Sequence, residues 1–113
     1  MEKINVLILG SGGREYTLAW KISQSKHCHK LYIAPGNAGT GKFGENLALN
    51  MLDFDQIRQA VIEKNISMVV VGPEEPLVKG IHDYFLADPQ LSAVSVIGPT
   101  KAGAMLEGSK DLS

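Results

Sequence analysis

The sequence contains a single cysteine, Cys28, and no long apolar run. A lone cysteine excludes an internal disulfide and a cysteine-based metal site, and a free thiol fits a reducing compartment. No apolar segment approaches the ~20 residues that a membrane-spanning helix needs, and the start of the chain shows no signal-peptide pattern. The formal net charge of −1 gives no bulk attraction to nucleic acid or to an anionic membrane. We therefore expect a cytoplasmic protein that binds neither nucleic acids nor membranes.

Short apolar runs recur along the 113 residues, at 4–9, 31–34, 67–71 and 94–97. Runs of this length without polar alternation are typical of strands that are buried on both faces of a parallel sheet. Amphipathic segments lie between them and predict helices. Because strands alternate with helices, the expected fold is α/β, with a parallel sheet flanked by helices and joined by right-handed crossovers.

Turn and capping residues suggest where the first helices begin and end. A first helix is expected over Arg14–Ser25, directly after a glycine-rich loop. The segment 37–50 is expected to be a loop with one short strand at 47–49. Asp53 is expected to cap a second helix, with Gln56 completing a capping box.

Two further helices are expected in the second half of the chain. Pro76 is placed to start a third helix. Apolar residues at four-residue steps would form its buried face: Leu77, Ile81 and Phe85. Thr100 is expected to cap a last short helix that ends near Gly108.

The segment Gly10-Ser11-Gly12-Gly13 separates the first strand from the first helix. Open α/β sheets bind ligands at this position, at the carboxyl ends of their strands. Small residues let backbone N–H groups approach a phosphate, and the helix N-terminus adds about half a positive charge. Arg14 follows in the first helical turn, where its guanidinium is suited to an anion. The loop therefore indicates a phosphate site, although a tight turn with a solvated Arg14 would give the same pattern.

The kind of phosphate ligand is narrowed by the residues after this loop. A dinucleotide site has a third glycine where this chain has Glu15, and an acidic residue about 20 residues further on. Here no acidic residue occurs from Tyr16 to Gly44. Nor does Gly-Lys-Ser/Thr come after the loop, as it would in a Walker A motif. A smaller phosphorylated ligand is favoured, with Glu15 either bonding a hydroxyl or amine or only complementing the helix dipole.

Two more loops follow strands at the same expected edge of the sheet. Pro35-Gly36-Asn37-Ala38-Gly39-Thr40 offers N–H and hydroxyl donors, and Gly72-Pro73-Glu74 offers a carboxylate. Each could be only a turn, but successive strand ends line one edge, which is where a site belongs. His27, Cys28 and His29 cluster at the opposite edge and indicate a surface turn, because no matching metal ligands occur elsewhere. We find no catalytic nucleophile and no metal ligands in this chain.

These motifs resemble, in order and spacing, the phosphoribosylamine–glycine ligases, which are ATP-grasp enzymes. The resemblance spans the whole chain. It is carried by Gly10–Glu15, Leu18–Lys21, Ala34–Thr40, Val71–Glu74, Pro76–Leu77, Gly80, Gly98–Thr100 and Leu106–Lys110. It implies a Rossmann-like pre-ATP-grasp domain over residues 1–100, with 101–113 leading into an ATP-grasp domain and a carboxyl-terminal domain that this chain lacks.

The resemblance also implies an activity for the full-length protein. Enzymes of this family join glycine to 5-phosphoribosylamine in purine biosynthesis, with ATP and Mg²⁺ or Mn²⁺. Glycine is activated as an acyl phosphate, and the amine then displaces phosphate. The loops Gly10–Glu15 and Pro35–Thr40 would hold the phosphoribosyl part, with Gly72, Pro73 and Glu74 in the same cleft. ATP and the metal would bind beyond Lys110, so the fragment alone is expected to bind no cofactor and to be inactive.

One position departs from the family pattern. The family usually has His after the Arg-Glu pair, and this chain has Tyr16. A phenol with a pKa of about 10 can replace a hydrogen bond but is a poor proton carrier near neutral pH. A structural role for this position is therefore expected, and the phenol argues against a proton-handling role.

Three alternatives stay open at this point. The first is an NAD(P)-dependent oxidoreductase domain, against which Glu15 and the acid-free stretch count. The second is a stand-alone sugar-phosphate sensor, and the abrupt end after Lys110 counts against it. The third is another purine-pathway ATP-grasp ligase, which Ala34–Thr40 disfavours relative to the glycine ligase.

Overall fold

The computed structural model describes residues 3–111, with side chains in the last helix described as far as Leu106. Outside this range lie the first two residues and the last two, Leu112 and Ser113, which belong to the expected linker. The strands are β1 (Ile4–Gly10), β2 (Cys28–Pro35), β3 (Glu45–Asn46), β4 (Ile66–Val71) and β5 (Ser95–Ile97). The helices are α1 (Gly13–Ser23), a 3-10 helix (Thr40–Lys42), α2 (Phe54–Glu63), α3 (Glu75–Val78), α4 (Ile81–Ala87) and α5 (Pro99–Asp111).

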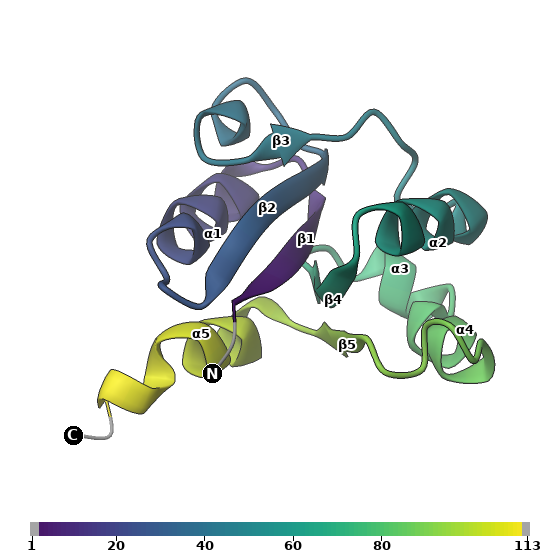
Figure 1. Cartoon of the computed structure of the whole chain (residues 1–113). Coiled ribbons are helices and arrows are strands. Elements are labelled where there is room, and N and C mark those ends of the chain that lie inside the picture. Colours follow the sequence, from purple (N-terminus) through teal and green to yellow (C-terminus); the bar gives the residue numbers. More distant parts are fainter. Residues whose placement is uncertain (1–2, 112–113) are drawn as a thin grey trace.

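The strands form one sheet in the order β3-β2-β1-β4-β5, and all neighbouring pairs are parallel. The chain runs outward from the central β1 to β3, then returns to the other side of β1 for β4 and β5 (Figure 1). The strand order therefore reverses beside β1. This architecture confirms the predicted Rossmann-like α/β fold.

Helices cover both faces of the sheet and enclose two apolar layers (Figure 1). Side chains along β1 alternate between them, with Leu7 and Leu9 in one layer and Val6 and Ile8 in the other. The first layer is closed by α2 and α4, and the second by α1 and α5. Burial on both faces explains why β1 and β4 are continuous apolar runs, as the sequence predicted.

The expected third helix is in fact two helices. Gly80 adopts the left-handed conformation, with φ of 91°, and separates α3 from α4. Leu77 is 48% exposed, so its predicted place on a buried face is wrong, whereas Ile81 and Phe85 are buried. Glycine adopts this conformation at little cost. The turn at Gly80 interrupts the helix, so Leu77 does not continue the buried face formed by Ile81 and Phe85.

Three smaller expectations also need correction. The last helix begins at Pro99, so Thr100 lies inside its first turn, and the helix continues through Gly108. The first helix ends at Ser23 rather than Ser25. The short strand lies at Glu45–Asn46 and not at 47–49, because these residues pair with Tyr32 and Ile33 of β2. The predicted cap at Asp53 is confirmed, since its side chain accepts the Gln56 N–H.

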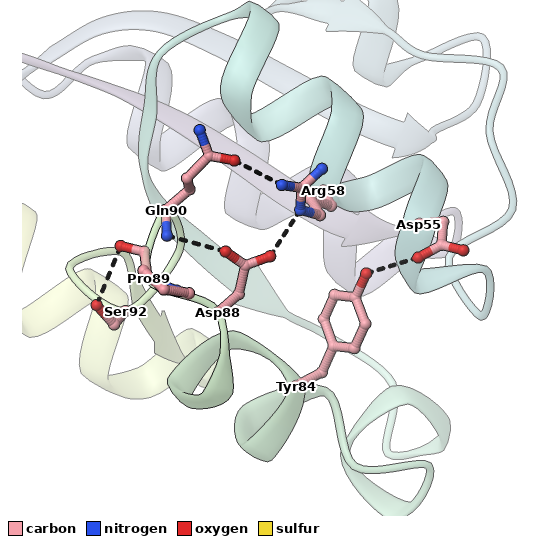
Figure 2. Close-up of polar contacts among 7 residues, drawn as sticks. All are labelled: Asp55, Arg58, Tyr84, Asp88, Pro89, Gln90 and Ser92. Carbon is pink, nitrogen blue, oxygen red and sulfur yellow. Dashed lines mark hydrogen bonds and ion pairs between the residues drawn. The ribbon is translucent and has the colours of Figure 1, made fainter.

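Polar contacts join α2 to α4 and to the turn after it (Figure 2). Arg58 Nε donates to Asp88 Oδ2 over 2.6 Å, and Arg58 Nη2 donates to Gln90 Oε1. The hydrogen bond from Arg58 to Asp88 is the main reason that the pKa of Asp88 is lowered. The Tyr84 hydroxyl donates to Asp55 Oδ1 over 2.7 Å, which raises the pKa of Tyr84. These contacts fix the two helices on the sheet face away from α1.

Candidate functional site

The carboxyl ends of the three central strands lie side by side. Gly10 of β1 pairs with Pro35 of β2, and Leu9 of β1 pairs with Val71 of β4. The next residues continue the pattern, since Gly36 N donates to Gly10 O and Gly72 N donates to Leu9 O. The loops after β1 and β4 therefore meet where the strand order reverses, which is where open α/β sheets bind ligands.

The predicted site residues lie in three segments of the chain. The first loop is Gly10–Glu15, the second loop is Pro35–Thr40 and the third loop is Gly72–Glu74. A groove of about 360 Å³ lies between the first and third loops. Its lining residues are Gly12, Gly13, Arg14, Glu15, Gly72, Pro73 and Glu74. The structure thus brings most of the predicted residues of these two loops together, whereas the second loop lies outside this groove.

Glu15 occupies the floor of the groove rather than its surface. Its side chain is 7% exposed, and its Oε1 accepts the Gly12 N–H over 2.8 Å. A Cβ atom built on Gly10 or on Gly72 would collide with the Glu15 carboxyl group. The two glycines are therefore needed for the close approach of this carboxylate to the backbone of both loops, and Gly10 has in addition a φ of 138°.

Arg14 extends from the first turn of α1 to the third loop. Its Nη1 donates to Gly72 O over 3.2 Å, and the side chain remains exposed. Arg14 also lines a larger groove of about 600 Å³ between α1 and α5, together with Lys21 and Thr100. A cation thus stands between the two grooves, where it is available to an anionic ligand.

The second loop is held by its own side chains. Asn37 N donates to Thr40 Oγ1 over 2.7 Å, and Thr40 N donates to Asn37 Oδ1 over 2.9 Å. Asn37 Nδ2 donates to Ser11 O over 2.7 Å, which ties the second loop to the first. Thr40 is fully buried, so its hydroxyl serves the loop. Pro35 and Ala38 are at least partly exposed, and Gly36 has a φ of 73°.

Tyr16, the position at which the resemblance led us to expect His, lies in α1 and packs against the second loop. Its ring lies edge-on to the Phe43 ring with centroids 5.3 Å apart. A Cβ on Gly39 would lie 2.5 Å from the Tyr16 ring, so only glycine fits there without displacement. The aromatic ring therefore packs α1 against the second loop.

Other candidate residues lie away from the groove. His27 is in the turn before β2, but Cys28 and His29 begin that strand, so the predicted surface turn is wrong for these two residues. Burial raises the pKa of the Cys28 thiol to about 11. Among residues 3–106, whose side chains the structure describes, no three His, Cys, Asp or Glu side chains are grouped to hold a metal ion. The described side chains therefore offer Mg²⁺ no group of three such ligands. No helix within the same range is long and apolar enough to cross a membrane.

One contact residue was missed by the sequence analysis. Asn46 of β3 bonds both Asn37 and Thr40, at 2.7 Å each. It lies outside every recognised motif, in a segment expected to be a loop. No local signal identifies it, because its role depends on the pairing of β3 with β2.

Comparisons with known proteins agree with this architecture. Residues 4–107 match the family model described as phosphoribosylglycinamide synthetase, N domain. Phosphoribosylamine–glycine ligases of Rhodopirellula baltica and Mesorhizobium japonicum are 52% and 51% identical to the chain, over 110 and 107 residues. In the crystal structure of phosphoribosylamine–glycine ligase from Thermotoga maritima, the matched part has a TM-score of 0.50 and 32% identity. It covers 65% of this chain and 16% of that one.

The matches to the two curated ligases cover 97% and 95% of this chain, but 24% of each relative. The chain thus spans about a quarter of the length of those proteins. The match over 104 consecutive positions, 4–107, confirms the resemblance that the strand-end motifs indicated. This chain belongs to the phosphoribosylglycinamide synthetase N-domain family.

Proposed function

We propose that the chain is the substrate-binding amino-terminal domain of a phosphoribosylamine–glycine ligase, and that its strand-end loops hold 5-phosphoribosylamine. The observation that carries this proposal is the groove between the first and third loops, at the reversal of strand order in a domain of this family. Three ionisable residues, Arg14, Glu15 and Glu74, are among those that line the groove.

Each loop has a proposed part in binding. Gly12 and Gly13 of the first loop line the groove and leave room for a phosphoribosyl group beside the backbone, and N–H groups in the first turn of α1 favour an anion. Arg14 supplies a fixed positive charge, and Glu74 supplies an acceptor for hydroxyl or amine groups. The second loop, Pro35 to Thr40, lies at the same edge of the sheet and is bonded to the first loop through Asn37. It is proposed to shape the path by which the ligand reaches the first loop.

The proposed reaction of the full-length protein joins glycine to 5-phosphoribosylamine, while ATP is converted to ADP and phosphate. The carboxylate of glycine is phosphorylated by ATP, and the amine of phosphoribosylamine then forms the amide bond and releases phosphate. ATP and Mg²⁺ or Mn²⁺ are proposed to bind in the remaining three quarters of the protein. The 113 residues alone are therefore expected to give no turnover.

The proposal also gives the domain a place in the whole protein. Residues 1–100 would form the Rossmann-like domain, and 101–113 would lead into the protein's own ATP-grasp and carboxyl-terminal domains. Ala102 and Leu106 of α5 are buried against the sheet, so this leading helix would be anchored on the domain that it leaves. The proposed partners are the small molecules phosphoribosylamine, glycine and ATP, in the cytoplasm, as a step of purine (IMP) biosynthesis.

The proposal is tested by measuring ADP release from the full-length protein, with phosphoribosylamine generated in situ. Release that requires both phosphoribosylamine and glycine is the expected result. Release that does not depend on glycine, or none from well-folded protein, would refute the proposed activity. The 113-residue chain, tested in parallel, is expected to release no ADP.

A further inference from the structure

Asn46 is the polar centre of the second loop, although it lies in β3, six residues beyond the end of that loop. Its Nδ2 donates to Asn37 O over 2.7 Å, and its Oδ1 accepts from Thr40 Oγ1 over 2.7 Å. The Thr40 hydroxyl has one proton and a second acceptor, Asn37 O, at 2.9 Å. Asn46 is the nearer acceptor, and its amide uses both a donor and an acceptor, which no carboxylate or aliphatic side chain can reproduce.

The backbone around Asn46 is shaped to admit its amide. A Cβ atom on Gly36 would collide with Asn46 Oδ1, and one on Gly41 would lie 3.3 Å from Asn46 Nδ2. Gly36 also has a φ of 73°, which disfavours other residues. Gly36 in the second loop and Gly41 just after it therefore leave space for the amide of Asn46, a residue that is otherwise exposed.

The contacts of Asn46 continue to the first loop. Asn37, whose carbonyl is held by Asn46, donates from its own Nδ2 to Ser11 O over 2.7 Å. A second branch passes through the buried Thr40, whose backbone N–H bonds Asn37 Oδ1. Both polar atoms of the Asn37 side-chain amide are therefore bonded, Oδ1 to Thr40 N and Nδ2 to Ser11 O. Through this amide the second loop holds the carbonyl of Ser11 in the first loop.

We propose that Asn46 is a positioning residue for the phosphoribosylamine site, acting through Asn37 and Thr40 on the first loop. This inference rests on the proposed function. Asn46 itself touches neither the groove lining nor, on this account, the substrate. Its effect is to hold the Asn37 amide and the Ser11 backbone in the arrangement that the first loop needs before the ligand arrives.

The test uses Asn46→Asp and Asn46→Ala in the full-length protein, with steady-state kinetics for each substrate. Asp has the shape of Asn and keeps the acceptor toward Thr40, but loses the donor and sets an oxygen against Asn37 O. Ala removes both bonds without adding charge. We expect the KM for phosphoribosylamine to rise about tenfold in both variants, because the carbonyl of Asn37 loses the donor that holds it and the second loop is fixed less firmly against the first. The KM values for glycine and ATP should not change.

Asn50→Asp is the matched control. It adds the same charge four residues further on, and Asn50 uses its side chain as an acceptor only, from Leu52 N over 2.8 Å. Asp can replace that bond, so wild-type KM values are expected. Melting temperatures of all variants identify any that fail to fold, and Asn46→Ala tests the inference if Asn46→Asp does not fold.

The outcomes separate the inference from the proposed function. Wild-type protein without glycine-dependent ADP release would refute the proposed function and the inference with it. If the wild-type protein is active, a selective rise in the KM for phosphoribosylamine in the Asn46 variants supports the positioning role. A wild-type KM in folded Asn46 variants, an equal rise for all three substrates, or the same rise in Asn50→Asp would overturn it.

Discussion

The carboxylate of Glu15 lies against the Cα atom of Gly72, so that the first turn of α1 and the loop after β4 are in direct contact. A Cβ atom on Gly72 would overlap Glu15 Oε2 and would lie 3.1 Å from Leu9 O. Arg14, the neighbour of Glu15, donates to the carbonyl of the same glycine. Both sides of the groove are therefore joined by consecutive residues of one helix.

Gly72→Ala is expected to destabilise the 113-residue chain by about 1–3 kcal/mol, because the added methyl group must displace Glu15 or the β4 loop. Urea unfolding measures the difference. Gly103→Ala in α5 is the control, since a Cβ there meets nothing within 4 Å. That variant should be unchanged, or more stable by up to about 1 kcal/mol, because alanine favours a helix. Equal stability of Gly72→Ala and wild type would contradict the tight contact.

The ion pair between Arg58 and Asp88 predicts a dependence of stability on pH. Arg58 holds the pKa of Asp88 below its ordinary value of 3.8, mainly by donating a hydrogen bond. The resulting stabilisation is complete above pH 3.8 and is lost as the pH falls through the lower pKa of the folded state. Asp88→Asn should therefore be less stable than wild type at neutral pH.

The difference between Asp88→Asn and wild type should narrow on acidification below the ordinary carboxyl pKa. Urea midpoints of both proteins across this pH range measure it. Both groups are partly exposed, with side chains 35% and 20% accessible for Arg58 and Asp88, so added salt should also reduce the difference. A difference that is constant with pH would argue against the ion pair.

Cys28 is expected to react slowly with thiol reagents while the protein is folded. Burial raises its pKa from 9.0 to about 11. At neutral pH this leaves about a hundredfold less thiolate than an ordinary thiol, and the thiolate is the reactive form. Labelling with iodoacetamide, followed by mass spectrometry, should be slow in buffer and fast in denaturant. Equally fast labelling in both conditions would contradict the half-buried position of the thiol.

The central strands could be predicted from the sequence because burial on both faces leaves a local apolar signal. The break between α3 and α4 could not. The spacing of Leu77, Ile81 and Phe85 fits one continuous helix, and the left-handed conformation of Gly80 depends on packing that the sequence does not display. The predicted helix limits differ from the observed ones by one to three residues, because the ends of helices are only weakly determined by the local sequence.

The site was predictable in location but only partly in detail. Glycines and prolines mark the strand ends, so all three loops were expected at one cleft, but the groove lies between the first and third loops only. The burial of Glu15 was not predicted, because it depends on Gly72, a residue far along the chain. Asn46 was missed for the same reason, since its partners are brought to it by the pairing of β3 with β2.

The most direct test of the account is the KM for phosphoribosylamine of Arg14→Ala in the full-length protein. Lys26→Ala is the matched control, because Lys26 is an exposed cation in the turn before β2, at the opposite edge of the sheet. If the loops at the carboxyl ends of the strands bind the phosphoribosyl group, Arg14→Ala should raise this KM about tenfold or more. The KM for ATP and all constants of Lys26→Ala should be unchanged. A wild-type KM in folded Arg14→Ala would contradict the proposed site.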